Sequence, residues 1–191
     1  MFARSIRPAA SLLLAMTILL GIVYPLLITG IARLAFPRQA EGSLIREDGR
    51  LVGSTLIGQS FSDPRYFWGR PSATTPQPYN GIGSTGSNLG PLNPALLDAV
   101  KANAKALRDA DPGNRQPIPI DLVTASASGL DPEISSAGAL YQAARVARSR
   151  SLPIGQVEAL IQAHAEEPFL GVIGEPRVNV LELNLALDRM H

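Results

Sequence analysis

The residues of this sequence that could carry covalent chemistry are a few serines and a pair of lysines. A serine nucleophile needs a neighbouring base, and Lys101 and Lys105 are the only lysines of the chain. Ser87, Ser126 and Ser128 lie on predicted turns, but neither lysine follows a serine at helical spacing. We therefore expect no catalytic residue. A membrane-anchored extracytoplasmic serine hydrolase that uses Ser126 or Ser128 stays open as the alternative function.

Three other patterns of reactive residues are incomplete. Residues 81–90 are rich in glycine but lack the lysine with which a P-loop reaches phosphates. His164 and His191 lie far apart in the sequence and form no cluster of metal ligands. Asp131 and Glu133 flank a proline, where carboxylates more often cap a helix than transfer protons. The sequence predicts no metal and no cofactor of its own.

One uncharged apolar run determines where any function must be sought. Residues 8–32 contain no Asp, Glu, Lys or Arg, and as a helix they reach roughly 37 Å, enough to cross a hydrocarbon core of about 30 Å. A cleavable secretory signal is the alternative, although its apolar region is usually much shorter, about 7–15 residues. We predict one transmembrane anchor within residues 1–38, in which Pro25 kinks the helix, and one soluble domain over residues 39–191.

Charge excludes some partners and leaves the orientation of the anchor open. The 191 residues include 17 basic and 16 acidic side chains, a formal net charge of +1, so no strong field points to nucleic acid. Arginines flank the apolar run on both sides, and long domains translocate largely regardless of charge. The chain has no cysteine and thus needs no particular redox compartment. The partner predicted from composition is the lipid bilayer.

The soluble part is predicted to be of mixed α+β class. Residues 51–57 and 118–123 have the composition of short strands. Good N-caps at Asn93 and Ser135 predict two helices, over about 94–108 and 136–148, and residues 153–165 form another helical pattern. In the last segment, residues 181–187 have leucines that alternate as in a strand, but Asn179 and Glu182 resemble a capping pair, so we predict a helix there. Between the first strand and the first of these helices, residues 60–94 hold five glycines and six prolines without any period. Their aromatic residues provide enough apolar mass for a long ordered loop.

Several long strings of residues resemble the C subunit of the Kdp potassium-transporting P-type ATPase, the KdpC family. They are GSTLIGQSF (53–61), YFWGRPSA (66–73) continuing to PYN (78–80), GSNLGP (86–91), DLVTASASGLDP (121–132), YQAARVA (141–147) and GEPRVNVLELN (174–184). Together with the single N-terminal anchor, the resemblance covers nearly the whole chain.

The resemblance implies a non-catalytic accessory subunit of an ATP-driven, high-affinity potassium uptake complex. Its partners would be a channel-like A subunit, an ATP-hydrolysing B subunit and a small F subunit in the bacterial plasma (inner) membrane. The implied topology is single-pass with an extracytoplasmic soluble domain. The subunit would assist assembly and stability, and would also act as a catalytic chaperone that raises the ATP affinity of the B subunit. This chain lacks the Asp-Lys-Thr-Gly phosphorylation motif of the B subunit.

Direct contact with ATP would have to use a serine- and glycine-rich turn, because backbone amides in such turns can hold anions. The candidate contacts are Ser126, Ser128 and Gly129 on that turn, with Gln142 and Arg145 as side-chain contacts. A purely structural turn is the alternative. ATP would then reach the subunit only through the complex.

The residues that we expect to contact a partner subunit lie in the long loop. They are Tyr66, Phe67, Trp68, Arg70 and Asn88. Exposed aromatic residues and arginine are the usual anchors of protein interfaces. The alternative is that the aromatic side chains fill the core of the domain itself.

Overall fold

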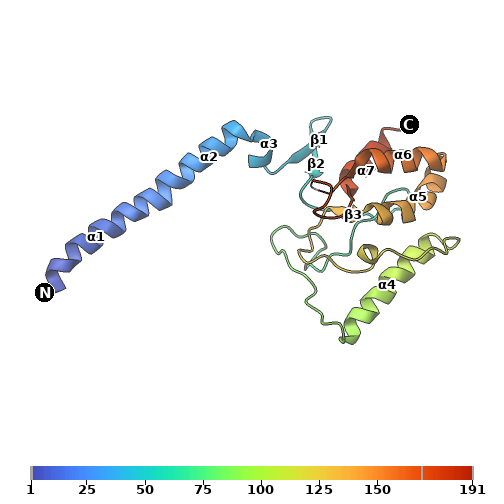
Figure 1. Cartoon of the computed structure of the whole chain (residues 1–191), viewed down its shortest axis with the longest axis horizontal. Helices are drawn as coiled ribbons and strands as arrows, with labels where there is room; N and C mark the ends of the chain where they lie inside the picture. Colours follow the sequence, from blue (N-terminus) through green and yellow to red (C-terminus); the bar gives the residue numbers. More distant parts are fainter. Residues whose placement is uncertain (1, 169, 191) are drawn as a thin grey trace. The chain divides into compact units, whose positions relative to one another are not determined.

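The computed structural model describes residues 2–168 and 170–190, which divide into two compact units, residues 1–44 and 45–191. The N-terminal unit is mainly one long helix that begins as α1 (Phe2–Ile18), continues as a π-helical turn (Leu19–Val23) and ends as α2 (Tyr24–Ala35) (Figure 1). Residues 5–35 are long and apolar enough to cross a membrane, with a mean hydropathy of 2.4. The predicted membrane-spanning helix is confirmed by length and composition.

The π-helical turn lies just before the proline of this helix. Pro25 has no N–H to donate, and its ring crowds the carbonyl one turn earlier. In the structure the N–H of Tyr24 donates to the carbonyl of Leu19, five residues back, which is the π-helical pattern. The irregularity expected at Pro25 therefore takes the form of one widened turn. A short helix, α3 (Pro37–Ala40), follows α2.

The soluble unit begins with a hairpin that the sequence analysis missed. Strands β1 (Leu44–Glu47) and β2 (Arg50–Ser54) form a two-stranded sheet. Asp48 and Gly49 connect them, both with positive φ, as a two-residue hairpin turn requires. The strand predicted over 51–57 ends early, at Ser54, and only an isolated bridge joins Ser54 to Ile57.

A small antiparallel sheet and three helices build the core. The sheet has the order β3-β5-β4, with β3 (Glu133–Ser135) and β4 (Ala165–Glu166) on either side of β5 (Arg177–Asn179). Helices α5 (Ser136–Arg150), α6 (Ile154–His164) and α7 (Val180–Asp188) pack against it and one another. Fully buried side chains from β3, β5 and the three helices meet in one cluster: Ile134, Val146, Val157, Ile161, Val178, Leu183 and Leu187. The α+β class is confirmed.

The predicted helices and their caps are present. Asn93 accepts a hydrogen bond from the N–H of Ala95 and opens α4 (Pro94–Ala110). Ser135 caps α5 through Gly138, and Asn179 caps α7 through Glu182. Each cap satisfies an amide that has no partner within its own helix.

The strand predicted over residues 118–123 is wrong. The segment contains a short 3₁₀ helix, η2 (Ile120–Leu122), preceded by Pro119. Proline has no N–H for a ladder, and Ile120 is 75% exposed while Leu122 is buried, so the segment does not lie inside a sheet. Its buried residue Leu122 belongs to the core cluster.

Candidate docking site around the long loop

Two buried side-chain amides hold the backbone of the long loop. The N–H of Phe67 donates to Asn184 Oδ1 (2.9 Å), and Asn184 Nδ2 donates back to the carbonyl of Phe67 (3.0 Å). In the same way the N–H of Trp68 donates to Gln142 Oε1 (2.9 Å), and Gln142 Nε2 donates to the carbonyl of Trp68 (3.1 Å). We call Gln142 and Asn184 the amide clamp. Both are 1% exposed, so they replace the neighbouring strand that this extended segment lacks.

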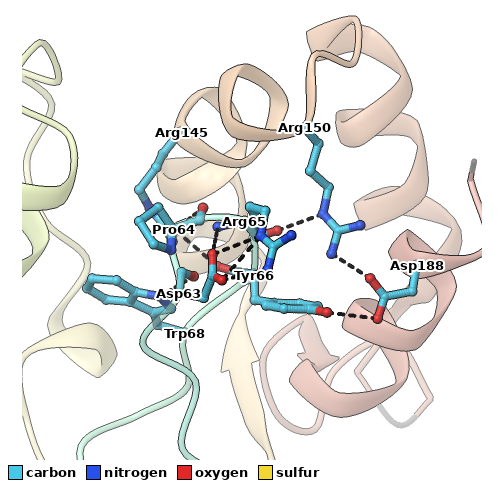
Figure 2. A network of polar contacts seen from close by, with 8 residues as sticks. All are labelled: Asp63, Pro64, Arg65, Tyr66, Trp68, Arg145, Arg150 and Asp188. Carbon is cyan, nitrogen blue, oxygen red and sulfur yellow. Dashed lines mark hydrogen bonds and ion pairs between the residues drawn. The ribbon is translucent and has the colours of Figure 1, made fainter.

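Arg145 binds the same segment from the neighbouring turn of α5. Its guanidinium donates to the carbonyls of Pro64 and Tyr66 (Figure 2). The same group donates to Gln142 Oε1. It also lies 4.6 Å from the centre of the Trp68 ring, a cation–π contact. Burial lowers the pKa of Arg145 to about 10, because desolvation disfavours the charged form. The side chain is thus still cationic at neutral pH and fully engaged inside the domain.

A third set of contacts continues the attachment to α7 (Figure 2). Arg150 donates to the carbonyl of Arg65 (2.8 Å) and pairs with Asp188 (2.6 Å). The hydroxyl of Tyr66 also donates to the Asp188 carboxylate (3.1 Å). The Arg150 guanidinium lies 4.7 Å from the centre of the Tyr66 ring. In the same loop segment, hydrogen bonds from Arg65 lower the pKa of Asp63. Residues 63–68 are therefore fixed at nearly every position.

The Gly-rich part of the loop is attached to the serine-rich turn. The N–H of Thr85 and the hydroxyl of Ser84 donate to the carbonyl of Ser128 (3.0 Å each). Ser126 is buried, and its Oγ accepts the N–H of Gly129 (2.9 Å). Gly129 has φ +68°, and a Cβ there would lie 2.6 Å from the carbonyl oxygen of Thr85. The turn thus serves as the surface on which the loop packs.

The five candidate nucleotide contacts divide into two groups. Ser126, Ser128 and Gly129 interact with residues 71–86, as does the Ser72 hydroxyl, which donates to the carbonyl of Gly129 (2.7 Å). Gln142 and Arg145 hydrogen bond to each other and to residues 64–68. Within the part of the chain that the structure describes, no hydrogen bond joins the two groups. Nucleotide binding by these residues stays a prediction.

The serine hydrolase alternative gains no support from these contacts. Ser126 Oγ accepts the N–H of Gly129, and Ser128 Oγ accepts the N–H of Leu130 (3.1 Å). The exposed Lys105 pairs with Asp109 one turn further along α4. Among residues 2–168 and 170–190, neither serine hydrogen bonds to a lysine or histidine, and no three His, Asp or Glu side chains gather as metal ligands.

The five candidate partner contacts differ in what they present to solvent. Phe67 is fully buried in the core. Tyr66, Trp68 and Arg70 are half-buried, and Asn88 is exposed on the loop at φ +52°. The alternative reading is thus correct for Phe67, and its side chain is not available to a partner.

A surface hollow lies beside the half-buried residues. Its volume is about 290 Å³, and Trp68 and Arg70 lie on its wall together with Tyr79 and, from α4, Asn103 and Leu107. Arg70 pairs with Asp131 (3.0 Å). The hydroxyl of Tyr79 donates to the Arg70 carbonyl (2.6 Å), and burial raises the pKa of Tyr79 to about 12.

Comparison with known families identifies the family of this chain. The sequence model of the family described as "K+-transporting ATPase, c chain" matches residues 6–189, from the apolar helix to the end of α7. The chain belongs to this family.

Full-length relatives of the c-chain family are similar throughout. The potassium-transporting ATPase KdpC subunit of Polaromonas naphthalenivorans (strain CJ2) is 63% identical over 185 residues, covering 97% of this chain and 94% of that protein. The KdpC subunit of Variovorax paradoxus (strain S110) is 64% identical over 183 residues, covering 96% and 95%. That of Dechloromonas aromatica (strain RCB) is 62% identical over 183 residues.

Sequence reasoning missed three residues that position the loop in this c chain. Asn184 lies among the leucines of α7, and a polar amide at a core position is the one signal that could have singled it out. Arg150 and Asp188 looked like ordinary surface charges near helix ends. Their role depends on the loop lying across α5 and α7, which no local pattern reveals.

Proposed function

We propose that this chain is an accessory subunit that docks on, and stabilises, an ATP-driven potassium uptake complex. Its soluble domain contacts the channel-like A subunit, and its anchor lies in the same bilayer as the A, ATP-hydrolysing B and F subunits. Membership of the c-chain family supports the complex, because its relatives are potassium-transporting ATPase KdpC subunits. The observation that carries the docking role is the extensively fixed loop.

The loop has no regular structure, yet side chains of α5 and α7 hold its backbone. The amide clamp, Arg145 and Arg150 together fix residues 64–68 through backbone atoms. A surface that is already ordered pays little entropy on binding, which favours affinity. The proposed contact surface consists of Tyr66, Trp68, Arg70 and Asn88, which keep some or all of their side chains accessible.

The effect on ATP that the resemblance implies would pass through the B subunit. Gln142 and Arg145 are buried and bound to the loop, so they are not free to meet a nucleotide at the surface. We therefore propose that any gain in ATP affinity follows from stabilising the assembled pump. The chain would be a single-pass protein of the bacterial plasma membrane with its soluble domain outside.

The docking surface is tested by paired substitutions that leave the amide clamp intact. Arg70→Ala removes a half-exposed cation, and Asn88→Gly removes a side chain while keeping a residue that tolerates φ +52°. With the four subunits co-expressed and the A subunit tagged, we expect the double variant to co-purify at least about tenfold less, as for loss of an interface anchor.

A matched variant controls for charge and for folding. Arg115→Ala with Gln116→Ala removes the same charge and an exposed amide from residues 111–116. We expect it to co-purify like the native chain. Both variants should keep the emission maximum of Trp68. Native-like recovery of the Arg70→Ala, Asn88→Gly chain would refute the proposed surface.

A further inference from the structure

A short turn between β4 and β5 holds apolar side chains out in solvent. Leu170, Val172 and Ile173 are 77%, 81% and 61% exposed. The N–H of Gly171 donates to the carbonyl of Pro168 (2.8 Å), and Leu170 and Gly171 both have positive φ, so the backbone turns sharply at this tip. We call residues 170–173 the apolar turn. It carries no charged side chain, so whatever covers it must be apolar.

The hairpin at the start of the soluble unit also exposes apolar side chains beside its charged residues. Leu51 and Leu56, on and just after β2, are 55% and 60% exposed. The apolar turn leads into β5 at Arg177, and the far end of β5 contacts the residue that follows β2, because Asn179 donates its side-chain amide to the carbonyl of Thr55 (2.8 Å). The exposed apolar groups of the soluble unit thus include two segments from distant parts of the sequence, which β5 links.

The chain itself ties this part of the soluble unit to a bilayer. The apolar span ends at Ala35 and β1 begins at Leu44. The eight residues between them reach at most about 28 Å when fully extended, and α3 (Pro37–Ala40) shortens that reach. The start of the hairpin is therefore tethered to the end of the apolar span by a connection no longer than this.

The hairpin carries two acidic residues, Asp48 and Glu47, the second paired with Arg189, and two arginines that suit a lipid surface. Arg46 and Arg50 are exposed. Arg33 lies in the last turn of the apolar span, and Arg38 follows the span. Arginine binds lipid phosphates through its planar fork while its stem lies along apolar groups. An apolar surface bordered by arginine is the pattern of segments that lie at the membrane interface.

We propose that the β1–β2 hairpin and the apolar turn rest on the bilayer that the chain's own anchor crosses. Leu51, Leu56 and Val172 enter the interfacial region of the lipid, and Arg46 and Arg50 bind its phosphates. The contact orients the soluble domain on the membrane before any other subunit is present. It does not depend on which side of the membrane the domain occupies.

The absence of cysteine from the chain makes a direct test possible. Val172→Cys and Leu51→Cys are each labelled with a fluorophore in the full chain, reconstituted alone into nanodiscs of phosphatidylcholine and phosphatidylglycerol. Gln116→Cys, exposed in residues 111–116, is the control site. Lipids that carry a nitroxide near the headgroup should quench the labels at 172 and 51 several-fold more than the label at 116.

Two results would overturn the proposal. One is equal quenching at all three sites, which would place the apolar groups in water. The other is quenching at 172 and 51 only by water-soluble nitroxides, with protection arising when the other Kdp subunits are added; a partner protein would then cover them. Because the first measurement uses the chain alone, its failure leaves the docking surface of residues 66–88 untouched.

Discussion

Replacing Asn184 with leucine tests the amide clamp most directly. Leucine has the same heavy-atom branching as asparagine, with methyl groups in place of the amide oxygen and nitrogen, so it is the apolar replacement closest in shape beside Leu183 and Leu187. The N–H and carbonyl of Phe67 both lose their partner in a place where water does not reach. An unsatisfied buried group costs about 1–3 kcal/mol, so we expect the free energy of unfolding to fall by roughly 2–6 kcal/mol. That is a large share of the stability of a typical domain, about 5–15 kcal/mol.

The chain provides its own probe for this measurement. Trp68 is the only tryptophan and lies beside the clamp. Its emission, followed in urea with the full chain in detergent, reports the unfolding of the loop together with the core. With a urea slope of about 1–3 kcal/mol per M, the transition midpoint should fall by at least about 0.7 M.

Asn103→Leu is the matched control. Asn103 on α4 is half-buried and donates one hydrogen bond, to the carbonyl of Val123 (3.1 Å). Only one backbone group loses its partner, so we expect a loss of about 1 kcal/mol. If Asn184→Leu were no more destabilising than Asn103→Leu, the backbone of Phe67 would not depend on the clamp, and the reasoning would be wrong.

Three further predictions use the same chain. Gly129→Ala should destabilise the domain by at least about 1 kcal/mol in urea, because φ is +68° and the new Cβ would meet the Thr85 carbonyl, whereas Gly155→Ala, in an open site within α6, should stabilise it by up to about 1 kcal/mol. Burial raises the pKa of Tyr79 from 10.0 to about 12, so the stability given by its neutral phenol is present below pH 10 and lost as pH rises towards 12. Tyr79→Phe should remove that part of the alkaline loss in urea titrations at pH 9 to 12, and an unchanged pH profile would contradict it. Single cysteines in place of Ser62 and Ser149, both exposed, should react with an impermeant thiol reagent in intact cells; labelling only after lysis would place the soluble domain inside.

Sequence alone was sufficient where the determinant is local. The apolar span is visible because a bilayer demands an uninterrupted run of residues. The helices α4, α5 and α7 were predictable because Asn93, Ser135 and Asn179 each satisfy an amide two or three residues further on. The long strings shared with the KdpC family likewise need no structure to be recognised.

Strands were predicted poorly because their partners are distant and their length is short. β3 and β5 are three residues long and β4 two, too few for any alternation to show. The apolar run at 118–123 met the composition of a strand, yet Pro119 and the absence of a pairing edge left it as a 3₁₀ turn. Composition indicates which residues can be buried, and pairing with another strand determines whether they form a strand.

The site itself was determined by tertiary structure. Residues 66–68 and 70 were recognisable as important, but whether each faces a partner or the core depends on α5 and α7. Asn184 reaches Phe67 across 117 positions of sequence, and Gln142 reaches Trp68 across 74. A local pattern predicts a helix and its cap because those hydrogen bonds close within one turn. The clamp closes only after the whole domain has folded, and for this reason only the tertiary structure could reveal it.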